Sequence, residues 1–102
     1  GADPGKAMLS GNAPIHYAAI SGNRFIGEAL LKAKASVDVQ NDNGETPLIL
    51  AAREGHNDFV SVLLEYHANV NIADNLQHTA LYYAGERGFN EIVEKLLENG
   101  AE

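Results

Sequence analysis

The chain repeats itself about every 33 residues, and this period constrains its fold more than any other feature of the sequence. Residues of one kind recur at that spacing at glycine, small and large apolar positions. The recurring sets are Gly22, Gly55 and Gly88; Ala18, Ala51 and Ala84; Leu30-Leu31, Leu63-Leu64 and Leu96-Leu97; Ala35, Ala68 and Ala101; and the apolar Ile15, Leu48 and Leu81. So many matches at one offset indicate a repeat protein whose copies stack on their neighbours.

The copy at residues 41–73 is the most regular and predicts two short helices. Thr46-Pro47 forms a helix start, because Thr accepts backbone N–H groups at the N-cap and Pro suits the first turn. A first helix is expected over residues 48–53, and Gly55 follows where a left-handed C-cap residue is needed. A second helix is expected over residues 56–64, with apolar residues at helical spacing along one face.

The segments between the helix pairs read as tight turns. Asn43-Gly44 is a strong hairpin-turn dipeptide, and Val70 and Ile72 alternate as in an extended segment. Each pair of short helices has an apolar face that it cannot bury alone, so stability comes from stacking about three or more copies. The predicted fold is therefore an all-α repeat, an α-solenoid of helix-turn-helix pairs joined by β-hairpin-like turns.

These residues resemble the ankyrin repeat over essentially the whole chain. The segment Gly44-Glu45-Thr46-Pro47-Leu48, with Ala51-Ala52, Gly55-His56 and Asn69-Val70-Asn71, matches the family pattern closely. The expected organisation is one domain in four parts. Residues 1–7 are the tail of a preceding repeat, and the three repeats are 8–40, 41–73 and 74–102. Because the chain begins and ends at the same point of the period, we expect a segment of a longer array or an engineered derivative.

Several residues depart from the family pattern and predict unequal copies. Ala13 replaces the capping Thr, at a cost of about 1 kcal/mol. Lys34 and His67 stand where the family has a left-handed Gly, at a cost on the order of 1 kcal/mol each, and Gln77 replaces the turn Gly. A consensus design would not carry these faults, which favours a natural sequence or a derivative of one. The first copy is expected to fray most readily.

Composition and charge exclude several function classes. Residues 1–40 carry four basic and three acidic residues, whereas residues 41–102 carry three basic and eleven acidic residues. This acidic surface disfavours nucleic-acid binding and favours a partner with a basic surface. No apolar run approaches the roughly 20 residues of a membrane span. The absence of Cys favours a cytoplasmic or nuclear location and excludes thiolate chemistry.

The four histidines do not form a metal or catalytic site by their spacing. No two lie four residues apart on a predicted helix, and no Cys or clustered carboxylate joins them. The resemblance implies that His16 forms hydrogen bonds within and between repeats. No nucleophile motif is present, so the sequence predicts no enzyme, no cofactor, no metal and no small-molecule substrate.

The resemblance implies that a partner protein binds a concave surface, made by the hairpin tips and the outer side of the first helices. The residues predicted to contact the partner are Leu9, Ile20, Asp42, Asn43, Glu45, Arg53, Tyr66, Asn75, Leu76, His78 and Arg87. Asn71 resembles a target of asparaginyl hydroxylation, although the simpler interpretation is that it bonds the hairpin backbone. The alternative function is a structural spacer within a larger array, with binding elsewhere.

Overall fold

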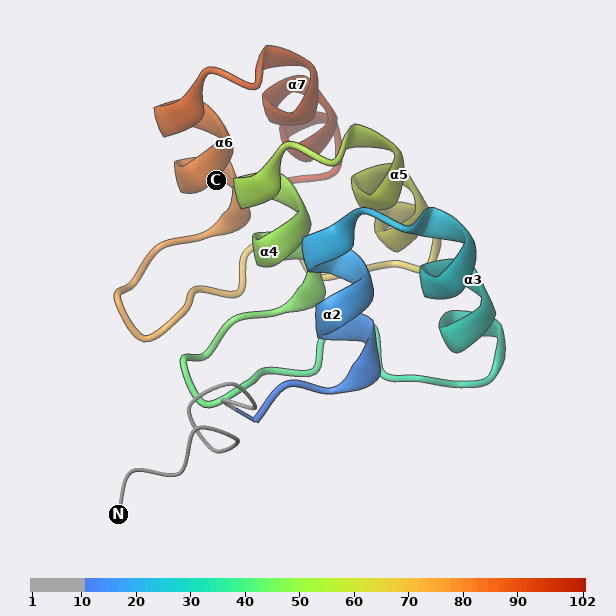
Figure 1. The fold of residues 1–102 in the computed structure, drawn as a ribbon. Helices are drawn as coiled ribbons and strands as arrows, with labels where there is room; N and C mark the ends of the chain where they lie inside the picture. Colours follow the sequence, from blue (N-terminus) through green and yellow to red (C-terminus); the bar gives the residue numbers. More distant parts are fainter. Residues whose placement is uncertain (1–10) are drawn as a thin grey trace.

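The computed structural model describes residues 11–102, and this part of the chain forms paired α-helices (Figure 1). The helices are α2 (Pro14–Ser21), α3 (Arg24–Lys32), α4 (Pro47–Glu54), α5 (Asn57–Glu65), α6 (Ala80–Arg87) and α7 (Asn90–Glu98). Helices α2, α4 and α6 stack in a first layer, and α3, α5 and α7 stack behind them in a second layer. The described residues contain no strand, which confirms the predicted all-α solenoid.

The starts and ends of the helices follow the residues that predicted them. The Thr46 hydroxyl oxygen accepts the N–H of Ile49 at 3.2 Å, and Thr79 caps α6 in the same way. Gly55 ends α4 with φ 77°. The observed helices begin and end one residue away from the predicted 48–53 and 56–64. Their starts differ because Pro47 is already helical and His56 is the N-cap of α5.

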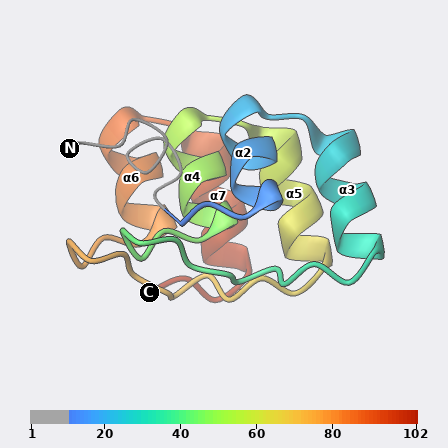
Figure 2. The same cartoon turned by 60° about the horizontal axis from the view of Figure 1, so that its bottom comes forward.

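Two loops, residues 39–46 and 72–79, extend past the first helix layer (Figure 1) and run side by side (Figure 2). Each closes a tight turn. Gly44 N–H donates to the Asn41 carbonyl at 2.9 Å, and Gln77 N–H donates to the Asp74 carbonyl at 2.9 Å. A further bond joins the two loops directly, from the Asn75 N–H to the carbonyl of Asn43. They are hairpin-like turns without strands, as predicted.

The core lies between the two layers and is most complete in the middle copy. Leu48, Phe59 and Leu63 are almost fully buried there. The second layer closes tightly at Gly27, since a Cβ atom at that position would lie only 2.5 Å from the Phe59 ring. Small and large residues therefore match across the contact between α3 and α5.

The start of α2 replaces the missing Thr cap with a histidine. Ala13 is the N-cap and offers no side-chain acceptor. Instead, the buried His16 ring accepts the Ala13 N–H at Nδ1, at 2.8 Å. Because Nδ1 accepts, Nε2 carries the proton and donates toward the carbonyls of Val39 at 3.0 Å and Glu45 at 2.8 Å. The hydrogen bonds implied by the resemblance, within and between copies, are confirmed.

The left-handed positions also follow the prediction. Lys34, His67 and Gln77 have φ values of 75°, 65° and 68°. The described helix pairs fall within residues 8–40, 41–73 and 74–102. The expected tail over residues 1–7 lies outside the described residues.

Candidate functional site

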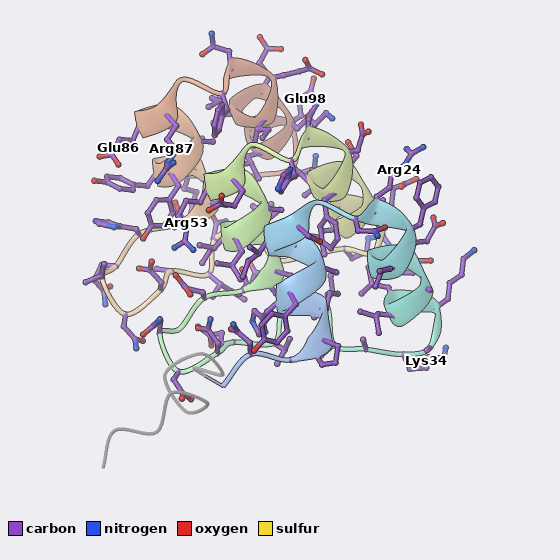
Figure 3. All side chains as sticks on the ribbon, viewed as in Figure 1. Arg24, Lys34, Arg53, Glu86, Arg87 and Glu98 are labelled. Atoms are coloured by element: carbon purple, nitrogen blue, oxygen red, sulfur yellow. The ribbon has the colours of Figure 1, made fainter. Side chains whose placement is uncertain are left out.

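We call one surface the hairpin face: the loops 39–46 and 72–79 together with the exposed sides of α2, α4 and α6. Figure 3 shows Arg53, Glu86 and Arg87 on this side of the molecule, and Arg24 on the opposite side. Ile20, Arg53 and Glu86 lie one repeat period apart, so they occupy the same place in three successive copies. This position is therefore apolar in the first copy, basic in the second and acidic in the third.

An ion-pair cluster occupies the centre of the hairpin face. The Arg53 guanidinium bonds the Glu45 carboxylate at 2.6 Å, lies 3.6 Å from the Glu54 carboxylate and sits 5.7 Å from the centre of the Tyr83 ring. Burial lowers the pKa of Arg53, but the hydrogen bond and charge of Glu45, with the charge of Glu54, raise it above its ordinary value. Arg53 and Glu45, both half-buried, are therefore held in place.

A buried carboxylate fixes the second loop. Asp74, 4% exposed, accepts the Tyr83 hydroxyl at 2.5 Å and the N–H groups of Leu76 and His78 at 3.0 and 2.9 Å. Burial raises the pKa of the Asp74 carboxyl, but these hydrogen bonds outweigh it and hold the pKa below its ordinary value. Burial and the bond to Asp74 raise the pKa of Tyr83 to about 12. At neutral pH the pair is a carboxylate and a neutral phenol.

Aromatic rings continue the face along α6. His78 stacks on Tyr82, with ring centres 3.8 Å apart and planes 13° apart. The Tyr82 hydroxyl donates to the Glu86 carboxylate at 2.9 Å, and this bond raises the pKa of Tyr82. From the sequence alone, Tyr82 and Tyr83 suit packing and recognition equally well. Only the structure reveals their bonds to Glu86 and Asp74, since nothing in the repeat pattern specifies them.

Most of the residues predicted to contact a partner lie on the hairpin face. Glu45, Arg53 and His78 are half-buried there. The exposed members are Ile20, Asp42, Asn43, Asn75, Leu76 and Arg87. Leu76 is 70% exposed at the tip of the second loop. Leu9 lies outside the described residues.

The prediction that Tyr66 belongs to this surface is wrong. Tyr66 follows α5, in the second helix layer, and packs partly against the core. The repeat pattern explains the error. Tyr66 stands just before the left-handed residue His67 that ends the second helix, whereas the loops and first helices supply the hairpin face.

Asn71 bonds the backbone of the next copy. Its side-chain N–H donates to the Gly100 carbonyl at 3.1 Å, and its oxygen accepts the Glu102 N–H at 3.0 Å. Asp38, one period earlier, accepts the N–H of Asn69 in the same way at 2.9 Å. Asn71 therefore bonds the backbone, as the simpler interpretation expects, but the bonds reach the turn after α7 and not a hairpin loop. Hydroxylation of this residue stays a prediction.

Clustered metal-binding side chains and long apolar helices are both absent from residues 11–102. This part of the chain holds no group of three or more His, Cys, Asp or Glu side chains that could bind a metal ion. None of its helices is long and apolar enough to cross a membrane.

The stacked helix–turn–helix pairs and their projecting loops define the chain as an α-helical repeat protein. The family model of ankyrin repeats matches residues 15–102 in three copies. The chain therefore belongs to the ankyrin repeat family, whose repeats are generally protein–protein interaction modules and typically non-catalytic. A comparison with curated proteins gave no match.

Proposed function

We propose that the chain binds a partner protein through the hairpin face. The observation that carries this proposal is the alignment of exposed apolar, aromatic and charged residues on a rigid surface. Leu76, Tyr82 and Ile20 are 70%, 42% and 40% exposed. Large exposed apolar and aromatic side chains, bordered by charges, are typical of the centre of an interface.

The loops are arranged before binding, which favours docking with little movement. Asn75 bonds the first loop twice, from its N–H to the Asn43 carbonyl and from its side chain to the Asp42 carbonyl, both at 2.9 Å. Asp74 holds the second loop through three hydrogen bonds. A surface that is already ordered loses less conformational entropy on binding.

The charge of the hairpin face favours a partner with a basic surface. Asp42 and Glu86 are exposed, and the described residues place no cationic group in an ion pair with either carboxylate. Arg53 is already paired with Glu45. Acidic groups that lack a cation attract basic partners and raise the association rate.

The test compares two leucine variants, Leu76→Ser on the hairpin face and Leu97→Ser on α7, where Leu97 is 53% exposed. Proteins captured by the unmodified chain are identified, produced recombinantly and titrated against each variant by calorimetry. Circular dichroism checks that both variants keep their helices. We expect Leu76→Ser to weaken binding at least fivefold, as for a residue worth about 1 kcal/mol or more, and Leu97→Ser to leave it unchanged.

Equal effects of the two variants, or no effect of Leu76→Ser, would contradict binding through this face. Capture of nothing specific would favour the alternative function, a structural spacer within an array.

A further inference from the structure

The second helix layer has a groove on each side of α5, and a lysine side chain of the chain itself bridges only one of them. In the groove between α5 and α7, the Lys95 ammonium donates to the Ser61 hydroxyl at 2.6 Å and reaches the Asn57 carbonyl at 3.5 Å. Its methylene stem crosses from α7 to α5. This side chain ties the third copy to the second.

The groove between α3 and α5 has the same framework with different residues. One period before Lys95 stands Val62, and one period before Ser61 stands Glu28. The position that supplies the cation is therefore apolar here, and the position that accepts it has changed from a hydroxyl to a carboxylate. The acceptor has become stronger, while the lysine that would use it is missing.

An open space of about 270 Å³ remains between α3 and α5. Its lining is Arg24, Phe25, Glu28, Val62 and Glu65. Val62 is nearly buried at 6% exposure, whereas Phe25 is 72% exposed. The apolar part of the lining suits a methylene chain, and the two carboxylates suit an ammonium group.

The exposure of Phe25 does not come from its place in the first copy. Asp58 and Glu91 occupy the same position in the later copies, and both are exposed as well. The first copy therefore presents an aromatic ring at a position where the other copies present acids. Such a ring offers apolar surface on which the methylene stem of a long cationic side chain can pack.

The cations already near the groove leave its acidic part accessible. Arg24 lies over the Phe25 ring, 5.0 Å from the ring centre. Lys32 lies 4.0 Å from the Glu28 carboxylate, and its side chain is 69% exposed. An exposed ion pair this long contributes little and exchanges readily with another cation. Glu65 has no ion-pair partner among the described residues.

We propose that the groove between α3 and α5 binds a lysine side chain of a partner protein. Its methylene stem packs on Phe25 and Val62, and its ammonium group pairs with Glu28 and Glu65. This inference is independent of the hairpin face, because the groove lies in the other helix layer. It gives the molecule a second contact surface, of which the chain's own Lys95 in the neighbouring groove is the internal example.

The test is a titration of the isotope-labelled chain with the peptide acetyl-Ala-Ala-Lys-Ala-Ala-amide, followed by NMR. The comparison peptide carries an Nε-acetylated lysine, which keeps the stem and removes the charge. We expect saturable shifts at the amides of Glu28, Val62 and Glu65 and at the Phe25 ring. Because a single exposed side chain supplies the contacts, the dissociation constant should be on the order of 10 mM.

Three variants test the arrangement of the site. Glu28→Gln should raise the dissociation constant about three- to fivefold, the effect of an exposed ion pair. Val62→Lys copies the neighbouring groove and should abolish binding by filling the space. Glu94→Gln is the matched control, because Glu94 occupies the position of Glu28 in the third copy and is exposed. It should leave the dissociation constant unchanged.

The proposal fails if the acetylated peptide shifts the same amides to the same extent, or if Glu28→Gln binds as tightly as the unmodified chain. Shifts centred on α7 would also overturn it. Should Val62→Lys fail to fold, the comparison of Glu28→Gln with Glu94→Gln still decides. None of these outcomes depends on the hairpin face, which Leu76→Ser tests separately.

Discussion

The two hairpin loops have the same turn but are held to the helices by different means. Loop 39–46 is fastened by His16, a neutral donor from α2 in the preceding copy, which reaches the carbonyls of Val39 and Glu45. Loop 72–79 is fastened by Tyr83, from α6 in its own copy, through the Asp74 carboxylate. The first connection joins two copies, and the second stabilises a single copy.

The difference follows from two substitutions within the period. Ile49 stands one period after His16, and its side chain has no donor for the second loop. Asn41 stands one period before Asp74, and its amide bonds Asn12 and Glu45 instead of a tyrosine. The same fold can therefore couple its copies through a buried histidine or stabilise them one at a time through a buried acid.

The largest expected effect is that of His16→Ala. The change leaves the Ala13 N–H and two loop carbonyls without a partner and opens a cavity, so we expect a loss of about 3 kcal/mol. Urea denaturation measures it. Amide exchange should also quicken in α2 and α3 more than in α6 and α7, because the first copy loses its connection. A loss below about 1 kcal/mol, or uniform exchange, would show that His16 does not couple the copies.

Tyr83→Phe should have the next largest effect and should depend on pH. It removes a hydrogen bond to a buried carboxylate, at a cost of about 2 kcal/mol at pH 7. Because the pKa of Asp74 is lowered in the folded state, its stabilisation is complete above the ordinary carboxyl pKa. It is lost as the pH falls through the lowered value.

Urea denaturation at pH 7 and near pH 3 tests this sign. The difference between Tyr83→Phe and the unmodified chain should shrink in acid. Tyr82→Phe is the control, since its hydroxyl bonds only the exposed Glu86, and its effect should be much smaller than that of Tyr83→Phe at both pH values. A difference that grows in acid would contradict the assigned state of Asp74.

The starts of α4 and α2 should differ by a smaller amount. Thr46→Ala removes the cap of α4 and should cost about 1 kcal/mol, whereas Ala13→Thr adds a cap to α2 and should gain somewhat less. Thermal unfolding measures both. If Ala13→Thr destabilises the chain, a Thr cap and the His16 ring are incompatible at the start of α2. Holding loop 39–46 with His16 would then exclude the usual helix cap, a constraint that loop 72–79 does not impose.

The smallest expected effect is a gain from Gln77→Gly of about 0.5 kcal/mol. Gln77 has φ 68° in the second loop, where the first loop has Gly44 at φ 77°. Glycine relieves the left-handed strain but also makes the unfolded chain more flexible, so the net gain is small. Gly44→Ala should do the opposite, since its Cβ would lie 2.9 Å from the backbone nitrogen of Asn75. Thermal unfolding compares the two changes, and a shift of the same sign for both would contradict this account.

The sequence predicts the fold well because its period is carried by backbone requirements. Thr46, Gly55 and Lys34 stand at positions that need a cap or a left-handed residue, and the structure confirms each. The ring of His16 also lies where the resemblance places it. Such positions repeat in every copy, so a single chain samples them three times.

The candidate site is less predictable because it depends on residues that do not repeat. Tyr83 pairs with Asp74, and Arg53 pairs with Glu45. Each pair joins a loop residue to a helix residue, and the sequence does not show how the loop between them folds back. The sequence places Tyr66 on the wrong surface because an aromatic residue near a turn resembles a contact residue. Tyr66 is excluded from the hairpin face only by its position after α5, in the second helix layer. The groove at Val62 is likewise recognised only by comparison with the groove that Lys95 bridges.

The contact of Gly27 with Phe59 means that each copy packs well only against its own neighbour, so the order of the copies is fixed. At the equivalent junction between α5 and α7, Val60 stands in place of Gly27 and Ile92 in place of Phe59. If the second and third copies were exchanged, Ile92 would face Gly27 and leave a void. Phe59 would face Val93, which leaves no space for its ring. The three copies therefore share one fold but cannot exchange places. To extend the array, both residues of each contact between copies must be transferred together.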